Sequence, residues 1–180
     1  MGQLTVQLAA VAPMLVAVDL SRTAIGNARE RLRGAGARAR FVLASVTALP
    51  FRDGSFDVVV LSDGLHSWQL PREERQLALA EAHQVLERGG HALLTEYLPP
   101  RAFLEFVAQV RASPLEVVWI EYLYDRVWYQ LESWFKAVRR WGSVQRVFAS
   151  VPFARFLCAV GRLFGRRCSR HIAVAVRKSP

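Results

Sequence analysis

The most constraining feature of this 180-residue sequence is the run FDVVVLS at residues 56–62. The run is almost continuously apolar and rich in valine, which favours a strand buried on both faces over one that alternates between core and solvent. A strand of this kind belongs to a sheet that is covered by helices on both faces. The run therefore predicts an α/β protein built on a mostly parallel sheet.

The residues around this run alternate regularly between strand-like and helix-like segments. Expected strands lie at residues 15–18, 40–44, 91–97, 116–123 and 171–177, and expected helices at 5–10, 21–32, 72–87 and 101–111. The pair Gly89-Gly90 is expected to end the third of these helices, because glycine is typical just past a helix terminus. We expect the strand at 171–177 to close the sheet antiparallel to its neighbours.

Three stretches, in their order and spacing, resemble the class I S-adenosylmethionine-dependent methyltransferases that act on small molecules. They are VAVDLS at 16–21, LPFRDGSFDVVVLSDGLHSW at 49–68 and VLERGGHALLTEY at 85–97. The resemblance covers roughly residues 1–98 and, less closely, the closing strand. It implies a Rossmann-like sheet, S-adenosyl-L-methionine as the cofactor, and methyl transfer to an oxygen, nitrogen or carbon atom of a small molecule.

The resemblance also implies a set of cofactor-binding residues at the carboxyl ends of the strands, where ligands sit in such sheets. Asp19 is expected to accept hydrogen bonds from both ribose hydroxyls, with Leu20 beside it. Ser45 stands where the family usually has an aspartate that addresses the adenine, and Val46 would offer the ring its backbone N–H. Ser62 is expected near the methionine end of the cofactor.

Two residues that follow the run at 56–62, His66 and Asp63, are candidates for catalysis. His66 could take a proton from a substrate hydroxyl or amine, because its imidazole titrates near neutral pH. The alternative is that His66 only lines the pocket, since methyl transfer often needs positioning more than a base. Asp63 is the candidate orienting carboxylate, and Glu96, at the end of a neighbouring strand, is a candidate for substrate contact.

The start of the sequence, GQLTVQLA at residues 2–9, resembles the helix that follows the family's glycine-rich loop. Gly2 would be the last glycine of that loop, and the first strand and the other loop glycines do not precede it. We therefore expect Met1 to be an internal methionine read as a start, and cofactor binding by this chain to be weak. The strand at 15–18 would then either pair with 56–62 or keep an unpaired edge.

A basic, mostly helical insertion at about residues 125–168 precedes the closing strand. Residues 126–180 contain ten arginines and two lysines but only one acidic residue, Glu132, and aromatic residues are interleaved with the arginines. Three interpretations are open: a lid on the substrate pocket, an interfacial element for a membrane or lipid-like substrate, and nucleic-acid contact. Nucleic acid is least favoured, because the run at 56–62 ends in SDGLHS and not in the DPPY-like motif of DNA amino-methylating enzymes.

The remaining sequence features limit the organisation of the chain. We expect one domain over residues 1–180, with a cofactor-binding core at 1–114 and C-terminal strands with the basic insertion at 115–180. Two cysteines and four histidines show no metal-ligand spacing, so no metal site is expected. The uncharged first 18 residues lack the basic segment of a signal peptide, which predicts a cytoplasmic protein.

Two other functional classes are compatible with parts of the pattern. A non-catalytic methyltransferase-like relic or binding module would explain the absent loop and the serine at position 45. A nicotinamide-dependent dehydrogenase shares the acidic residue at a strand end, but its fingerprint does not include PFRDGSFD.

Overall fold

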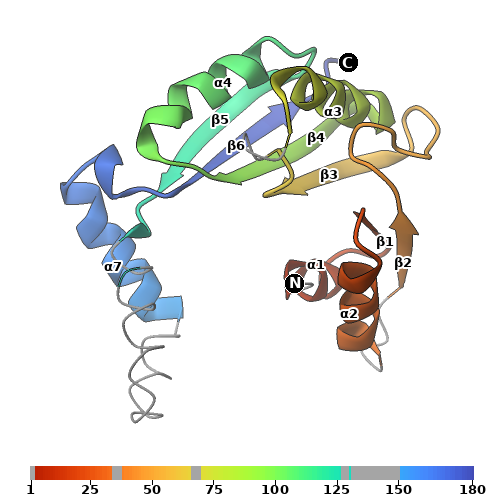
Figure 1. Ribbon diagram of the computed structural model, residues 1–180, viewed down its shortest axis with the longest axis horizontal. Helices are drawn as coiled ribbons and strands as arrows, with labels where there is room; N and C mark the ends of the chain where they lie inside the picture. Colours follow the sequence, from red (N-terminus) through yellow and green to blue (C-terminus); the bar gives the residue numbers. More distant parts are fainter. Residues whose placement is uncertain (1–2, 34–37, 66–69, 127–129, 131–150) are drawn as a thin grey trace. The chain divides into compact units, whose positions relative to one another are not determined.

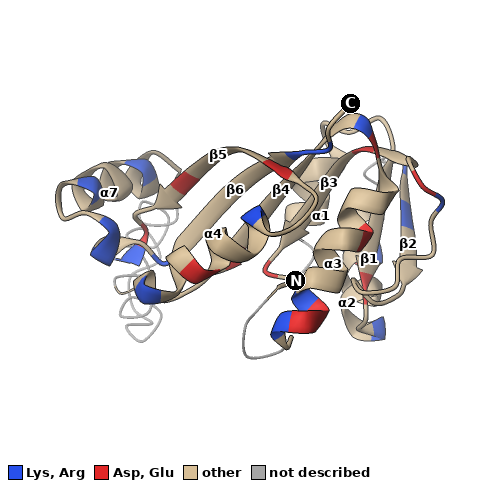
Figure 2. Ribbon diagram, turned by 90° about the horizontal axis from the view of Figure 1, so that it is seen from above, with Lys and Arg blue, Asp and Glu red and all other residues tan. Residues whose placement is uncertain are grey.

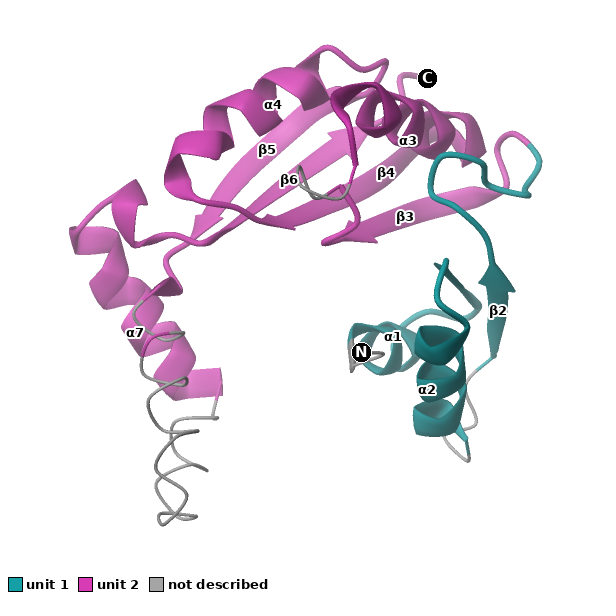
Figure 3. Cartoon of the chain, viewed as in Figure 1, with its two compact units in different colours: residues 1–52 teal, residues 53–180 magenta. Residues whose placement is uncertain are grey.

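The structure is a computed structural model that describes residues 3–33, 38–65, 70–126, 130 and 151–180. It contains two compact units, residues 1–52 and 53–180, which have different colours in Figure 3. The expectation of a single domain over the whole chain stays a prediction.

The first unit is a small parallel strand pair with two helices (Figure 1). Strand β1, Leu15–Asp19, pairs with β2, Ala39–Leu43, in a regular parallel register. Helix α1, Gln3–Ala9, precedes β1, and helix α2, Arg22–Leu32, connects the two strands. Each element lies within two residues of its expected position, so the sequence pattern predicted this region well.

Helix α2 begins after an N-cap residue, Ser21, that the sequence predicts. The hydroxyl oxygen of Ser21 accepts a hydrogen bond from the backbone N–H of Ala24, at 3.2 Å, and so satisfies one of the free N–H groups of the first turn. The buried face of α2 is narrow and consists of Ala24, Ala28 and Leu32.

The second unit is a four-stranded mixed sheet in the order β3-β4-β6-β5. Strand β3, Phe56–Ser62, runs parallel to β4, Leu86–Tyr97. Strand β6, His171–Arg177, lies antiparallel between β4 and β5, Glu116–Leu123. The predicted antiparallel closing strand is therefore confirmed.

The core of the second unit lies between this sheet and two helices on one of its faces (Figure 1 and Figure 2). The helices are α3, Arg72–Val85, and α4, Phe103–Arg111, which follows a 3-10 turn at Pro100–Ala102. The large side chains that are almost completely buried include Leu79, Val85, Leu94, Phe103, Val110, Ile172, Val174 and Val176.

The expectation that Gly89-Gly90 ends a helix was wrong. Helix α3 already ends at Val85, and β4 begins at Leu86, so both glycines lie inside the strand. A side chain at Gly90 would come within 3.1 Å of the Asp57 carbonyl oxygen on β3, and Gly89 has a φ of +77°. The glycines thus allow an irregular start of β4 close to β3, where the register shifts.

Strand β3 is also less buried than its apolar sequence predicts. Val58 is 55% exposed, and no residue of β3 is fully buried. The reason is topological: among the described residues β3 pairs only with β4, and β1 pairs only with β2. Of the two outcomes expected for the strand at 15–18, an unpaired edge is the one that the described residues show.

The described end of the basic insertion is helix α7, Val151–Leu163, followed by a 3-10 turn at Arg166–Cys168. Helix α7 packs closely on the segment after β5, because a Cβ atom at Gly161 would lie 2.7 Å from the Tyr124 carbonyl oxygen. The aromatic residues of the basic insertion at 127–129 and 131–150 lie outside the described residues. Among the helices that the structure describes, none is long and apolar enough to cross a membrane.

Candidate functional site

In the first unit, the carboxyl ends of β1 and β2 bring two predicted cofactor-binding residues to one edge. The carbonyl oxygen of Asp19 accepts a hydrogen bond from the Ala44 N–H at 3.3 Å, so Ser45 follows directly beside the end of β1. The Oδ1 atom of Asp19 accepts from the Ser21 N–H at 2.8 Å, which fixes the exposed carboxylate at the start of α2. Leu20 is 71% exposed next to it.

Ser45 is held in a local turn. Its hydroxyl oxygen lies 2.7 Å from the hydroxyl oxygen of Thr47 and accepts a hydrogen bond from the Thr47 N–H at 3.2 Å. Val46 is half-buried within the same turn. The hydroxyl of Ser45 therefore has local partners, and its contact with an adenine ring, like that of Val46, stays a prediction.

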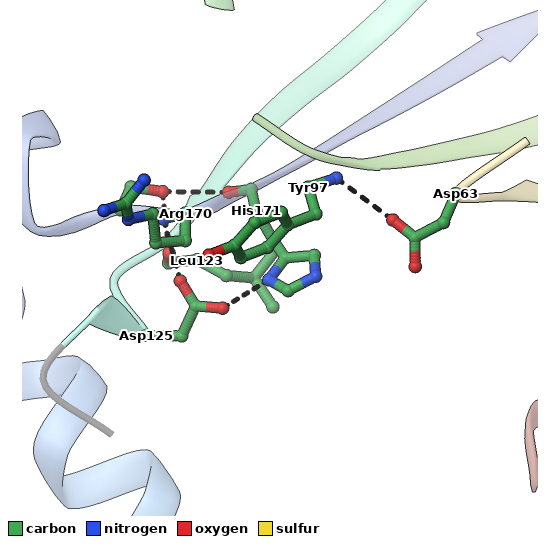
Figure 4. Close-up of polar contacts among 7 residues, drawn as sticks. Asp63, Tyr97, Leu123, Asp125, Arg170 and His171 are labelled. Atoms are coloured by element: carbon green, nitrogen blue, oxygen red, sulfur yellow. Dashed lines mark hydrogen bonds and ion pairs between the residues drawn. The ribbon is translucent and has the colours of Figure 1, made fainter. Parts of the chain in front are cut away.

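In the second unit, Ser62 and Asp63 stand at the carboxyl end of β3, beside the end of β4. The Ser62 hydroxyl oxygen accepts from the Thr95 hydroxyl at 3.2 Å. Asp63 has a φ of +51°, which is uncommon for a residue with a side chain. Its N–H donates to the Thr95 carbonyl at 2.8 Å, and its Oδ1 accepts from the Tyr97 N–H at 3.0 Å (Figure 4).

These two hydrogen bonds give the strained backbone of Asp63 a structural reason. The bond to the Thr95 carbonyl continues the backbone pairing of β3 with β4 beyond Ser62, and the bond from the Tyr97 N–H adds the side chain of Asp63 to that pairing. The carboxylate is consequently fixed at the edge where ligands bind in parallel sheets. The predicted orienting role of Asp63 is untested and stays a prediction.

Glu96 is a buried acidic residue next to this edge, only 1% exposed. Its Oε1 accepts a hydrogen bond from the Leu65 N–H at 2.5 Å. Burial, together with the nearby Asp63 carboxylate, raises the pKa of Glu96 to about 7, although the Leu65 N–H, Arg75 and His171 act in the opposite direction. This placement makes Glu96 a buried support of the edge and gives it no exposed surface for substrate contact.

A further polar cluster at the same edge was missed by the sequence analysis. Asp125, which follows β5, bonds to Nδ1 of His171, the first residue of β6, and to the N–H of Arg170 at 2.9 Å (Figure 4). The partners are 46 residues apart, so no local pattern could have paired them. The available signal was the antiparallel closing strand, whose register places His171 between Tyr97 and Leu123.

Two predicted site residues, Gly2 and His66, lie outside the described residues, so their predicted roles remain untested. Among the residues that the structure describes, no group of histidine, cysteine and acidic side chains could hold a metal ion.

Comparison with solved structures identifies the fold. The chain matches the N-methyltransferase NodS from Bradyrhizobium japonicum WM9, in complex with S-adenosyl-L-homocysteine, with a TM-score of 0.65 at 13% identity, over 99% of this chain and 74% of NodS. It matches the cyclase SpnF with a TM-score of 0.68 at 19% identity, over 99% of this chain and 71% of SpnF. The fold is therefore that of the class I S-adenosylmethionine-dependent methyltransferases, as the sequence predicts.

Sequence comparison then identifies the family. A family model described as "Methyltransferase domain" matches residues 1–94, so the chain belongs to the methyltransferase domain family. Among its relatives is a demethylmenaquinone methyltransferase of Thermus thermophilus, 33% identical over 101 residues, which cover 55% of this chain and 44% of the relative. This chain thus matches less than half the length of that relative.

Proposed function

We propose that this protein transfers a methyl group from S-adenosyl-L-methionine to a small, apolar ring molecule of the quinone class. The family match over residues 1–94 carries the proposal, because it includes Asp19, Ser45 and the β3 segment. The demethylmenaquinone methyltransferase among the relatives supports the choice of a quinone-like acceptor. SpnF, a cyclase with the same fold, is a reminder that the fold alone does not define the reaction.

The residues of the first unit fit the nucleoside part of this cofactor. The Asp19 carboxylate is exposed at a strand end and is fixed through Oδ1, while Oδ2 can accept from a ribose hydroxyl. Leu20 offers an exposed apolar side chain beside it, suited to the face of a purine ring. When bound, S-adenosyl-L-methionine supplies a methyl group on a positively charged sulfur.

The second unit supplies a rigid polar edge for the acceptor. Asp63 is fixed by the Tyr97 N–H, and the Tyr97 ring contacts the ring of His171 at the same edge. Fixed groups of this kind orient an acceptor atom, and orientation is a large part of what a bimolecular transfer requires. We also propose a cytoplasmic location.

A methyl-transfer assay tests this proposal. The chain is incubated in detergent micelles with methyl-labelled S-adenosyl-L-methionine and demethylmenaquinone that a chemical reductant keeps in its hydroquinone form. Labelled menaquinone is measured after reoxidation. We expect labelled product that an Asp19→Ala substitution reduces at least tenfold, because a hydrogen bond to a charged group contributes about 1.5 kcal/mol or more. Cofactor binding without any transfer would instead support the binding-module alternative.

We further propose that α7 contacts a membrane surface, where an apolar quinone would be found. On α7 and the residue after it, Phe156, Leu163 and Phe164 are 60%, 83% and 67% exposed. Basic residues lie on the same segment, as Figure 2 shows. They are Arg155, Arg162, Arg166 and Arg167. Exposed apolar side chains next to arginines are typical of helices that lie at the surface of anionic bilayers.

Co-sedimentation with lipid vesicles tests the membrane contact. We expect binding to anionic vesicles but not to neutral ones, and weaker binding at high salt. Leu163→Glu should reduce the bound fraction, whereas Leu104→Glu, at an exposed leucine of α4, should not. Equal binding of both variants, or no binding to either vesicle, would contradict the contact and favour a lid.

A further inference from the structure

Asp125 and His171 form a fixed pair at the carboxyl edge of the second unit (Figure 4). Asp125 uses Oδ2 for Nδ1 of His171 and Oδ1 for the Arg170 N–H, so both carboxylate oxygens are engaged by the start of β6. The side chains are 11% and 18% exposed, respectively. The imidazole is thus held in place and still reaches the surface.

The hydrogen bond to Asp125 determines the tautomer of the neutral imidazole. An ionised carboxylate can only accept, so Nδ1 of His171 must carry the hydrogen. The other ring nitrogen, Nε2, is then the basic one. A base oriented by a carboxylate in this way is the arrangement that enzymes use for proton transfer from a hydroxyl group.

The neighbours of this base in the second unit suit a hydroxylated ring molecule. His171 is paired with Tyr97 in the sheet, and their rings meet edge-on with centroids 5.0 Å apart. Asp63, the fixed carboxylate at the end of β3, bonds to the backbone of the same Tyr97. One edge therefore combines an aromatic ring, a carboxylate and an oriented imidazole, which suits a hydroxylated aromatic molecule.

The cluster also has a rigid base. Ser169 is completely buried, and its hydroxyl oxygen lies 2.6 Å from the carbonyl oxygen of Leu123 and 2.8 Å from that of His171. The Asp125 carboxylate also contributes to the raised pKa of the Cys158 thiol on α7, after the larger effect of burial. The hydrogen bonds of Asp125 and Ser169 thus join the end of β5 to the start of β6.

We propose that Nε2 of His171 accepts the proton of a hydroxyl group on the methyl acceptor, with Asp125 as its positioning residue. The inference rests on the proposed function. Loss of the hydroxyl proton to Nε2 of His171 makes the ring carbon beside the oxygen nucleophilic. As the methyl carbon bonds to this ring carbon, its bond to sulfur breaks and the electron pair stays on sulfur. The ring carbon then loses its hydrogen as a proton to solvent, and the oxygen takes its proton back from His171, so the imidazole returns to its neutral form.

The competing explanation is that the pair only ties the end of β5 to the start of β6. Both explanations predict a loss of stability when either residue is replaced. Only the proposal predicts that the pair distinguishes ligands with a hydroxyl group from ligands without one. The test therefore uses 1-naphthol and naphthalene, two ring systems that differ only in the hydroxyl.

Binding of both probes is measured with the 180-residue chain and its variants. We expect the chain to bind 1-naphthol about tenfold more tightly than naphthalene, because one hydrogen bond to a strong acceptor contributes a binding free energy of this size. His171→Gln and Asp125→Asn should remove most of this preference while naphthalene binding persists. His91→Gln is the matched control, because His91 is an exposed histidine in the middle of β4, away from Tyr97 at its carboxyl end.

A second measurement keeps the test informative if a variant does not fold. Nitrogen NMR of the unmodified chain should show a change at Nε2 of His171 with 1-naphthol and none with naphthalene. An unchanged Nε2 signal with 1-naphthol bound, or equal preference in the chain and in His171→Gln, overturns the inference.

The outcome is separable from that of the proposed function. If methyl transfer to demethylmenaquinone is observed but the hydroxyl preference does not depend on His171, only the inference fails. If no transfer is observed while Nε2 responds to 1-naphthol, the hydroxyl-binding site stands and the methyltransferase proposal fails.

Discussion

The two compact units of this protein differ in how well their strands are covered. In the first unit, the buried residues that the structure describes are Ala24, Ala28 and Leu32, all from α2, and every residue of β1 and β2 is at least partly exposed. In the second unit, residues of the two central strands β4 and β6 and of helices α3 and α4 form a much larger buried core. The comparison indicates that most of the folding free energy comes from the second unit.

This difference has a functional counterpart. The predicted cofactor-binding residues Asp19 and Ser45 lie in the sparsely packed unit, whereas Asp63 and the Asp125–His171 pair lie on the well-packed one. Binding sites with few buried neighbours gain order from their ligand, because a ligand that binds only the folded form stabilises it. We therefore expect the cofactor to stabilise the first unit in particular.

The largest expected effect comes from a matched pair of leucine truncations. Leu94 on β4 is 0% exposed and Leu43 on β2 is 45% exposed. Leu94→Ala should lower the free energy of unfolding by about 2–5 kcal/mol, because it leaves a cavity in the core. Leu43→Ala should cost less than about 1 kcal/mol, since the site is already open to water. Urea denaturation checks both values, and equal losses would contradict the comparison.

The sequence predicted where the strands lie but not how deeply they are buried. Local patterns correctly located the strands, because FDVVVLS and the other apolar runs are short and bounded by turn residues. The Ser21 cap and the closing strand were equally readable. The burial of individual strand residues could not be predicted, because the exposure of Val58 depends on which strands pair with β3. This pairing is a long-range property.

The sequence likewise predicted some residues of the candidate site and missed others. Asp19, Ser45, Ser62 and Asp63 could be proposed from motifs, because each stands at the end of an apolar run. The Asp125–His171 pair could not, since it forms between residues 46 positions apart across an insertion with no clear pattern. Gly89 and Gly90 were misread because glycine is typical both after helices and in irregular strand pairs.

Glu96 provides a second, pH-dependent test of the well-packed unit. Its folded pKa of about 7 is above the usual 4.5, so its ionisation favours the unfolded chain. Its stabilising contribution is complete below the usual value and is lost as the pH rises towards 7. Glu96→Gln should therefore stabilise the protein at pH 8 by on the order of 2 kcal/mol and change little at pH 4.

The matched control for this substitution is Glu87→Gln, at an exposed position of the same strand. It should leave the free energy of unfolding within about 0.5 kcal/mol at both pH values. An equal gain at pH 4 and pH 8 for Glu96→Gln would show that ionisation of this carboxyl is not the cause.

A further comparison of the two units uses two helical glycines, one in each unit. A Cβ atom at Gly161 on α7 would lie 2.7 Å from the Tyr124 carbonyl oxygen, so Gly161→Ala should cost about 1–3 kcal/mol. A Cβ atom at Gly26 on α2 would meet nothing within 4 Å, so Gly26→Ala should stabilise by about 0.5–1 kcal/mol. Thermal unfolding shows whether each substitution raises or lowers the unfolding temperature. A higher unfolding temperature for Gly161→Ala would contradict the packing of α7 on Tyr124.

The central claim is that the first unit holds the cofactor at the carboxyl ends of β1 and β2. Amide NMR during titration with S-adenosyl-L-homocysteine tests it directly and also detects weak binding. We predict shift changes concentrated at Asp19, Leu20, Ser45 and Val46, and at least tenfold weaker binding in Asp19→Ala than in the control Asp57→Ala. Shift changes confined to other residues, or equal affinity in both variants, would contradict the claim.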